Sequence, residues 1–220
     1  MPEIVGRKLR ILALHGYAQN ALFFNGKTGA LRKGLKAVAE LHYLEAPHAA
    51  GGSFFEIDAD TGRGSPRGWW NTDDERRPAV SASYVGLSES LALVDATIAS
   101  EGPFDGVLGF SQGATLAALL CLTRPTLFSF AICVAGFVPR DAAVAGAFES
   151  DAPAAIPTFH CTGETDASVP PEVCRRLAAC FVDPVVFSHP GGHVVPGNAP
   201  FRNGVKDFLR ALPPPDGDAS

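Results

Sequence analysis

Residues 106–122 read GVLGFSQGATLAALLCL, and this stretch decides the fold that the sequence predicts. Residues 106–110 form a short apolar run typical of a buried strand, and residues 113–122 are rich in Ala and Leu, as in a helix. Between them, residues 109–113 match G-x-S-x-G in the strand-then-helix setting of a nucleophile elbow. A serine helix cap flanked by turn glycines would give the same five residues, but the flanking strand and helix favour the elbow.

The elbow explains why these residue types stand at this spacing. Gly109 and Gly113 let the chain turn tightly, because a Cβ atom at either position would collide with neighbouring backbone. The turn places the Ser111 hydroxyl above the sheet at the amino end of a helix, where backbone N–H groups favour developing negative charge. Ser111 is therefore the candidate nucleophile.

Strands and helices alternate on both sides of this stretch. Buried strands are predicted at residues 9–14, 41–44, 130–134, 158–161 and 185–187. Helices are predicted around residues 31–38, 84–98 (with Ser81 and Ser83 as candidate caps), 171–180 and 205–212. This alternation indicates the α/β class, here an α/β-hydrolase fold: a mostly parallel, doubly wound sheet flanked by helices, with ligands at the carboxyl ends of the strands.

The chain is expected to form one domain over residues 1–212, followed by a disordered polar tail over residues 213–220. Residues 51–83 interrupt the alternation with a long loop. Loops of this length are uncommon unless they are functional or mobile, so this segment is a candidate lid. Trp69 and Trp70 in this loop either wall an acyl pocket or pack to anchor the loop.

Charge and hydropathy exclude several classes of protein. The net charge is −5 without any long basic run, so nothing favours nucleic acid or an anionic membrane as a partner. The amino terminus lacks the basic-then-apolar order of a secretory signal, and no apolar stretch approaches the ~20 residues of a membrane span. We therefore expect a cytoplasmic protein.

The five cysteines stand in no metal-like spacing. Three of them lie in apolar runs, where a free thiol packs as a small hydrophobic group. The sequence therefore predicts no metal site, no cofactor and no catalytic thiol. The residues concerned are Cys121, Cys133, Cys161, Cys174 and Cys180.

A base has to take the proton of the serine hydroxyl, and His193 is the candidate. In this fold the acid and then the histidine follow the nucleophile in the chain, which leaves His160, His189 and His193 as choices for the base. His160 lies in a strand-like segment and is expected in the core. His189 and His193 share the turn after the last strand. Two glycines free the backbone before His193, whereas Pro190 stiffens the chain after His189.

Asp166 is the candidate acid that fixes the tautomer of the histidine. It follows the strand that ends near residue 161 and precedes Val169-Pro170-Pro171, which would hold it in a short, rigid loop. Glu164 in the same loop and Asp183 before the last strand remain as alternatives.

The backbone N–H groups of Gln112 and Tyr17 are the candidate oxyanion hole. In this fold one donor belongs to the residue after the nucleophile, and the second comes from the loop after an early strand, here Leu14-His15-Gly16-Tyr17. Gly16 allows close approach. A plain turn with the His15 ring packed beneath it would use the same residues, and His15 is not assigned as a base.

Together these motifs resemble the family of serine hydrolases, a fungal and animal group of the α/β-hydrolase superfamily that includes homologues of ovarian-cancer-associated protein 2. The resemblance covers nearly the whole chain. It implies a cofactor-independent triad of Ser111, Asp166 and His193 that acts on acyl esters. Tyr17 stands where the family often carries Phe, which matters little because its backbone N–H is invoked. The segments concerned are Leu14-His15-Gly16, Gly68-Trp69-Trp70, residues 109–113, Gly163-Glu164-Thr165-Asp166 and residues 191–196.

The expected function is hydrolysis of a small-molecule acyl ester or thioester through an acyl-enzyme. The aromatic loop and modest charge favour a medium to long acyl chain over a charged peptide. Some fungal members of the family resemble thioesterases of secondary metabolism that release polyketide chains, so chain release from an acyl-carrier domain of a synthase, or acyl transfer, stays open. A ligand-binding protein without turnover would normally lack part of the triad. A dinucleotide-dependent oxidoreductase would carry G-x-G-x-x-G after its first strand, which this chain lacks.

Overall fold

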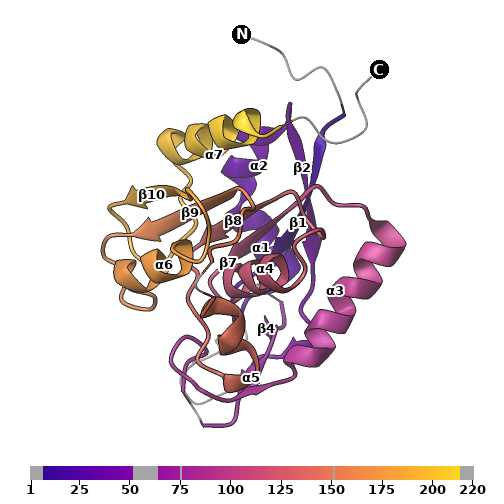
Figure 1. Ribbon diagram of the computed structural model, residues 1–220. Helices are drawn as coiled ribbons and strands as arrows, with labels where there is room; N and C mark the ends of the chain where they lie inside the picture. Colours follow the sequence, from indigo (N-terminus) through magenta and orange to yellow (C-terminus); the bar gives the residue numbers. More distant parts are fainter. Residues whose placement is uncertain (1–6, 52–63, 75, 151, 214–220) are drawn as a thin grey trace.

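The computed structural model of the protein describes residues 7–51, 64–74, 76–150 and 152–213. Its centre is a parallel sheet with the strand order β10-β9-β8-β7-β1-β2 (Figure 1). This single-domain arrangement confirms the predicted α/β-hydrolase fold, and the chain order reverses between β1 and β7. The strands are β1 (Leu9–Leu14), β2 (Ala39–Leu44), β7 (Gly106–Phe110), β8 (Phe130–Val134), β9 (Thr158–Gly163) and β10 (Val185–His189).

Helices cover both faces of the sheet. α3, α4 and α6 enclose one apolar core, and α1, α2 and α7 enclose the other. Neighbouring residues of β1 point to opposite sides, so Leu12 enters the first core and Ile11 the second, as the two-residue period of a strand requires. The helices are α1 (Ala21–Lys27), α2 (Gly29–Leu35), α3 (Leu87–Glu101), α4 (Gln112–Thr123), α5 (Ala142–Ala145), α6 (Pro171–Ala178) and α7 (Ala199–Ala211), with a short 3₁₀ helix at Gly146–Phe148.

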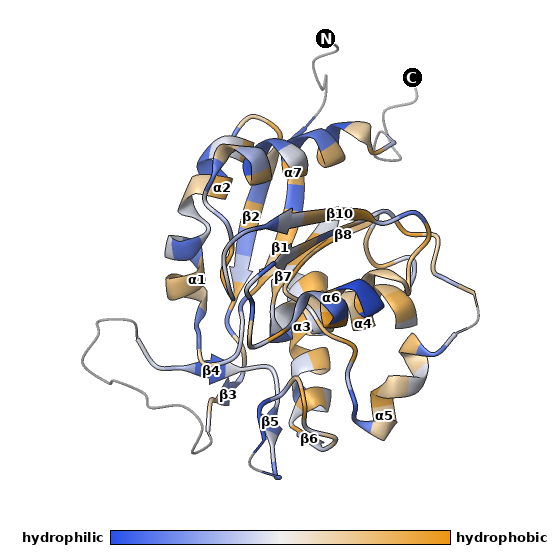
Figure 2. Cartoon of the chain, turned by 90° about the vertical axis from the view of Figure 1, so that its left-hand side faces the viewer, coloured by the Kyte–Doolittle hydropathy of each residue, from blue (hydrophilic) through white to orange (hydrophobic). Residues whose placement is uncertain are grey.

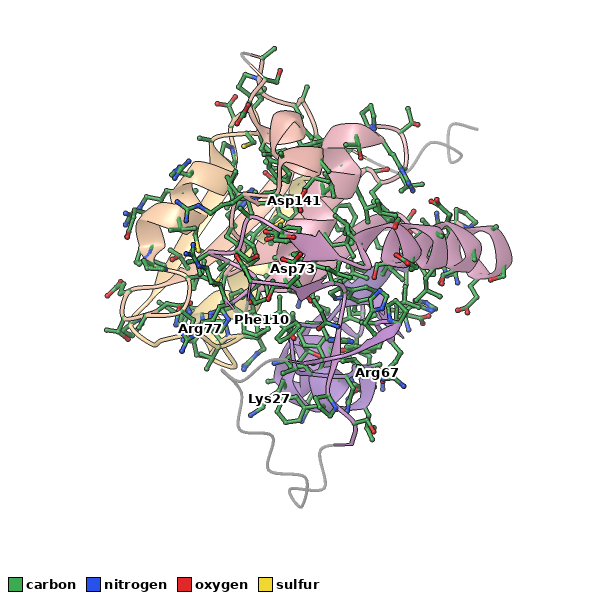
Figure 3. All side chains as sticks on the ribbon, turned by 90° about the horizontal axis from the view of Figure 1, so that it is seen from below. Lys27, Arg67, Asp73, Arg77, Phe110 and Asp141 are labelled. Carbon is green, nitrogen blue, oxygen red and sulfur yellow. The ribbon has the colours of Figure 1, made fainter. Side chains whose placement is uncertain are left out.

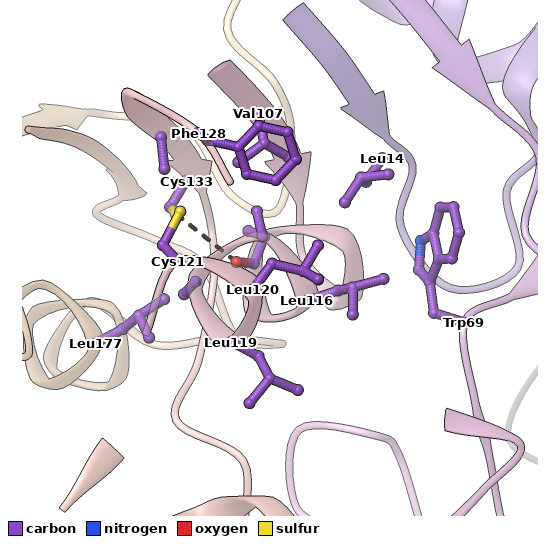
Figure 4. Packing of buried hydrophobic residues seen from close by; sticks show 14 of the residues in the cluster. Leu14, Trp69, Val107, Leu116, Leu119, Leu120, Cys121, Phe128, Cys133 and Leu177 are labelled. Atoms are coloured by element: carbon purple, nitrogen blue, oxygen red, sulfur yellow. Dashed lines mark hydrogen bonds between the residues drawn. The ribbon is translucent and has the colours of Figure 1, made fainter. Parts of the chain in front are cut away.

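The elbow segment lies at the centre of the molecule. Every residue of β7 and β8 is buried, as expected of parallel strands that are covered on both faces. Figure 2 shows these strands and α4 in hydrophobic colours, whereas α2 and α7 carry hydrophilic residues. In the close view of Figure 4, Leu116 and Leu120 of α4 lie on the side of the helix that faces Leu14 and Val107 of the sheet. α4, the helix that follows Ser111, is therefore fixed by packing along its length.

Several element boundaries differ from the sequence-based expectations. α3 begins at Leu87 rather than near residue 84, because Gly86 adopts a left-handed conformation (φ 91°) at its N-cap. Ser81 and Ser83 do not cap it, since the Ser81 hydroxyl is hydrogen-bonded within its own turn to Ser83. α7 begins at Ala199, earlier than expected, after an Asn198 cap.

The described part of residues 51–83 is packed against the domain. Four two-residue strands hold this region, and Trp69 and Trp70 are fully buried. The strands form two antiparallel pairs, β3 (His48–Ala49) with β4 (Arg67–Gly68) and β5 (Asn71–Thr72) with β6 (Tyr84–Val85). Residues 52–63 and residue 75 of the candidate lid, and residues 214–220 of the expected tail, lie outside the described residues.

Two properties of the described residues bear on other classes of function. No helix among them is long and apolar enough to cross a membrane. In the same part of the chain, no group of three or more His, Cys, Asp or Glu side chains is arranged to hold a metal ion.

Candidate active site

Ser111 stands at a sharp turn between β7 and α4. Its backbone has φ 53° and ψ −116°, a conformation that L-residues rarely adopt, and its N–H donates to the Val134 carbonyl of the next strand at 2.8 Å. A Cβ atom on Gly109 would lie 2.2 Å from the Gly113 carbonyl oxygen, and one on Gly113 would lie 2.2 Å from the Leu14 carbonyl oxygen. Both glycines of the motif are therefore required by close backbone approach.

The structure brings Ser111 and two other sequence-predicted residues, His193 and Asp166, into one hydrogen-bonded row. Nε2 of His193 lies 3.0 Å from the Ser111 Oγ. Nδ1 of the same ring lies 2.6 Å from Oδ2 of Asp166. Ser111, Asp166 and His193 follow β7, β9 and β10, so the three groups meet at the carboxyl edge of the sheet, where a doubly wound fold holds its ligands.

The Asp166 carboxylate is held in one orientation. Its Oδ1 accepts hydrogen bonds from the N–H groups of Ser168 and Val169, each at 2.8 Å, which leaves Oδ2 for His193. The Asp166 side chain is 0% exposed, whereas the His193 side chain is 25% exposed. The acid is thus shielded from water while the imidazole stays within reach of solvent and of an incoming substrate.

The loops after β9 and β10 are bonded directly to each other. Glu164 N–H donates to the His189 carbonyl at 2.8 Å, and Thr165 N–H donates to the Gly191 carbonyl at 3.3 Å. A Cβ atom on Gly163 would lie 2.4 Å from the Gly192 carbonyl oxygen, so only glycine fits there. These contacts fix the distance between the acid and the imidazole.

The other histidines and carboxylates that the sequence offered for the base and the acid lie outside the hydrogen-bonded row. The His189 ring is buried, and its Nδ1 accepts from Gly191 N–H at 3.2 Å, so it shapes the histidine loop. His160 is a buried core residue of β9, as expected. Glu164 is exposed, and Asp183 stands before β10, at the opposite end of that strand from His193.

The Phe110 ring, next in the chain to Ser111, contacts two loops of the candidate site. Its ring lies 4.8 Å from the His193 ring, measured between centroids, and a Cβ atom on Gly16 would lie 2.8 Å from it. Figure 3 views this edge of the sheet from below, with Phe110 near the middle and Lys27, Arg67 and Arg77 around it. One aromatic ring therefore contacts both the imidazole loop and the loop after β1.

The loop after β1 has the close approach to the elbow that an oxyanion loop requires. The Gly113 position at the start of α4 lies directly against the carbonyls of Leu14 and His15. Ala18 adopts φ 57°, and Gln19 N–H donates to the Gly16 carbonyl at 3.2 Å, which closes a tight turn around Tyr17. The Tyr17 hydroxyl accepts from Gly51 N–H at 2.9 Å and lies 2.8 Å from Oδ1 of Asn71.

The chain matches a known protein family and several curated relatives. Residues 4–205 match the family described as Serine hydrolase (FSH1). The chain belongs to this family. Among curated relatives, this serine hydrolase is 39% identical to Esterase OVCA2 of Danio rerio, over 92% of this chain and 96% of that protein. It is 38% identical to Esterase OVCA2 of Homo sapiens, again over 92% and 96%.

Solved structures agree at the level of the fold. Esterase PE8 superposes on this serine hydrolase with a TM-score of 0.65, at 19% sequence identity and 97% coverage of both chains. Acyl-protein thioesterase 2 of Zea mays gives a TM-score of 0.61, at 20% identity, over 95% of this chain and 97% of that one.

Of the two alternatives that the sequence leaves open for Trp69 and Trp70, the structure supports packing, because both are core residues of the serine hydrolase. Trp69 is 0% exposed and its Nε1 donates to the His15 carbonyl at 2.8 Å, while Trp70 is 1% exposed and stacks on Tyr84. Their backbone is held by the Gln112 side chain: Oε1 accepts from Trp69 N–H, and Nε2 donates to the Trp70 carbonyl, both at 2.8 Å. Sequence reasoning missed this side chain, because a contact across 42 residues leaves no local pattern.

The cysteines of the serine hydrolase are free, and most of them are buried. Burial raises the pKa of the Cys121 thiol to about 12 and the pKa of the Cys174 thiol to about 11. Burial also raises the pKa of Cys133, Cys161 and Cys180. A thiol with a raised pKa is a poor nucleophile near neutral pH, because little of it is present as thiolate.

Proposed function

We propose that this serine hydrolase cleaves carboxylic esters or thioesters of a small-molecule acyl group, with Ser111, His193 and Asp166 as its catalytic triad. The observation that carries the proposal is the continuous row from Ser111 Oγ through the His193 ring to the Asp166 carboxylate, with separations of 3.0 and 2.6 Å. A serine hydroxyl needs such a base, and the base needs such a carboxylate, to become a nucleophile.

In the first half of the reaction, Ser111 Oγ attacks the acyl carbonyl carbon and its proton passes to Nε2 of His193. The carbonyl oxygen becomes an oxyanion, which the N–H groups of Gln112 and Tyr17 would stabilise. Collapse of the tetrahedral intermediate breaks the bond to the alcohol or thiol, and His193 returns the proton to this leaving group. Asp166 stays ionised and supports the imidazolium while it exists.

In the second half, water replaces the leaving group. His193 takes a proton from the water as it attacks the acyl-enzyme, and the second tetrahedral intermediate releases the carboxylic acid and restores Ser111. The partial exposure of the His193 side chain supports this step, because water has to reach Nε2.

The proposed acyl group is apolar and of medium to long length. Leu22, at the start of α1 beyond the oxyanion loop, is 77% exposed, and Val194, beside His193, is 51% exposed.

Curated relatives that cover nearly the whole chain bear the name esterase, which supports the reaction class. The five free cysteines favour a reducing compartment, in keeping with the cytoplasm. Action on an acyl-carrier domain remains a prediction from the family resemblance.

The test compares the wild-type chain with Ser111→Ala. Turnover of p-nitrophenyl esters from acetyl to dodecanoyl should fall by about 10⁴-fold or more in the variant, with an unchanged unfolding temperature. A matched series of acyl thioesters measures ester against thioester preference, and product analysis with added alcohol measures acyl transfer. Retained turnover in Ser111→Ala would exclude Ser111 as nucleophile. A fluorophosphonate that fails to label the wild-type chain would instead indicate a binding protein.

A further inference from the structure

The His15 ring has both of its nitrogens engaged inside the protein. The side chain is 0% exposed and follows β1 directly. Ala46 N–H donates to Nε2 of His15 at 3.1 Å, so Nε2 carries the lone pair and a neutral ring carries its proton on Nδ1. Nδ1 lies 2.8 Å from the Gly16 carbonyl oxygen. The ring is therefore a hydrogen-bond donor to the oxyanion loop and cannot act as a base.

The surroundings of His15 keep the ring neutral and in place. Burial is the main cause that lowers the pKa of His15, and it outweighs the opposing effects of Gly16 and Glu45. The ring packs against Trp69 with centroids 5.2 Å apart, and Trp69 Nε1 donates to the His15 carbonyl. Side chain and backbone of His15 are thus fixed at the same time.

The hydrogen bond from Nδ1 of His15 sets the orientation of the peptide group between Gly16 and Tyr17. The Gly16 carbonyl accepts from Nδ1 of His15 and from Gln19 N–H, so its orientation is set by two donors. In a trans peptide the N–H of the following residue points opposite to the carbonyl, and here that N–H belongs to Tyr17. We propose that His15 is a positioning residue of the oxyanion hole, which aims the Tyr17 N–H at the acyl oxygen by holding the Gly16 carbonyl.

The second proposed donor is tied to the same network. Gln112 supplies its own N–H to the hole, while its side chain holds Trp69, whose indole holds His15. The two oxyanion donors are therefore connected through buried hydrogen bonds and not only through the sheet. This inference rests on the proposed function, since it assigns Tyr17 and Gln112 the task of binding an oxyanion.

A matched pair of variants separates the two nitrogens of His15. In His15→Asn the amide nitrogen replaces Nδ1 and can still donate to the Gly16 carbonyl. In His15→Gln the longer side chain places its amide at the Nε2 position. The amide oxygen can still accept from Ala46 N–H, but no donor remains for the Gly16 carbonyl. We expect kcat of His15→Gln to fall about 10- to 100-fold with little change in KM, and kcat of His15→Asn to stay within about fivefold of wild type.

Two further readouts distinguish positioning from a merely structural role. An alkyl trifluoromethyl ketone forms a tetrahedral adduct with Ser111, so its inhibition constant should rise in His15→Gln by the same factor as kcat/KM falls. The apparent pKa of the kcat profile should be the same in both variants and wild type, because His193 remains the base. Equal activity of both variants and wild type, or a loss that follows the unfolded fraction alone, would overturn the proposal.

The rate at which a fluorophosphonate labels Ser111 provides a test that does not depend on ester turnover. Phosphonylation also develops negative charge on an oxygen in the proposed oxyanion hole. If wild type cleaves neither esters nor thioesters, the proposed function fails. Slower labelling of His15→Gln than of His15→Asn would still support the role of His15, and equal labelling would reject it.

Discussion

Replacing Asp166 by Asn tests the catalytic row with almost no change in shape. Oδ1 of Asp166 accepts from two backbone N–H groups, those of Ser168 and Val169. In Asp166→Asn the amide oxygen should keep this position, so the amide nitrogen faces Nδ1 of His193. That nitrogen is a donor, and it requires an unprotonated Nδ1. The proton of the neutral His193 ring then sits on Nε2, facing Ser111. In this tautomer Nε2 cannot accept the proton of the serine hydroxyl.

The structure sets the size of this effect. The productive tautomer requires the amide to flip, which would turn its nitrogen toward the two backbone donors and leave both N–H groups without an acceptor. Each unsatisfied buried N–H costs about 1–3 kcal/mol, so the flipped state lies about 2–6 kcal/mol higher. With 1.36 kcal/mol for each factor of ten, kcat should fall by about 30-fold to 10⁴-fold.

The assay is kcat on a p-nitrophenyl ester, measured together with the unfolding temperature. Asp166→Asn should lose activity while its stability stays close to wild type, because Ser168 and Val169 keep an acceptor. Asp166→Ala is the matched control, since it removes that acceptor and should lower stability as well as activity. A kcat for Asp166→Asn within tenfold of wild type would refute the assignment of Asp166 as the acid that sets the tautomer.

Two further predictions concern buried rings. Burial lowers the pKa of His160 from 6.5 to about 4, so its contribution to the free energy of unfolding is complete above pH 6.5 and is lost as the pH falls toward 4, a change of about 3 kcal/mol. Urea titrations at both ends of this range should show a smaller loss in His160→Leu than in wild type, and equal losses would contradict the prediction. Trp69→Phe leaves the His15 carbonyl without its donor and should cost about 1–3 kcal/mol of stability and lower kcat. Trp70→Phe is its control, because Nε1 of Trp70 has no hydrogen-bond partner in the described part of the chain; equal stability losses in the two variants would count against the bond to His15.

The strands and the loops that carry the candidate site were predictable from local sequence. Buried strands read as apolar runs, and the rule that parallel strands end at one edge placed Ser111, Asp166 and His193 together before any contact was known. The short helix α1 was missed, since seven residues hold too little of the helical period to stand out. The start of α3 was misplaced because one left-handed glycine, Gly86, sets it.

The contacts that support the proposed oxyanion loop could not be predicted from the sequence. For Trp69 the sequence favours packing and leaves a substrate wall open, because nothing in its local sequence shows which residues it contacts. Its partners Gln112 and His15 lie 43 and 54 residues away in the chain. Contacts of this kind follow from the folded sheet and not from any pattern within one segment.

The backbone conformation of Ser111 serves the proposed catalysis but lowers the stability of the fold. A residue other than glycine at φ 53°, ψ −116° carries a conformational cost of about 1–3 kcal/mol. The surrounding close-packed glycines and carbonyls hold Ser111 in this conformation despite the cost. Glycine would adopt this conformation without that cost, so a glycine here would favour stability while removing the proposed nucleophile. A serine at position 111 is therefore explained by the proposed reaction and not by the stability of the fold.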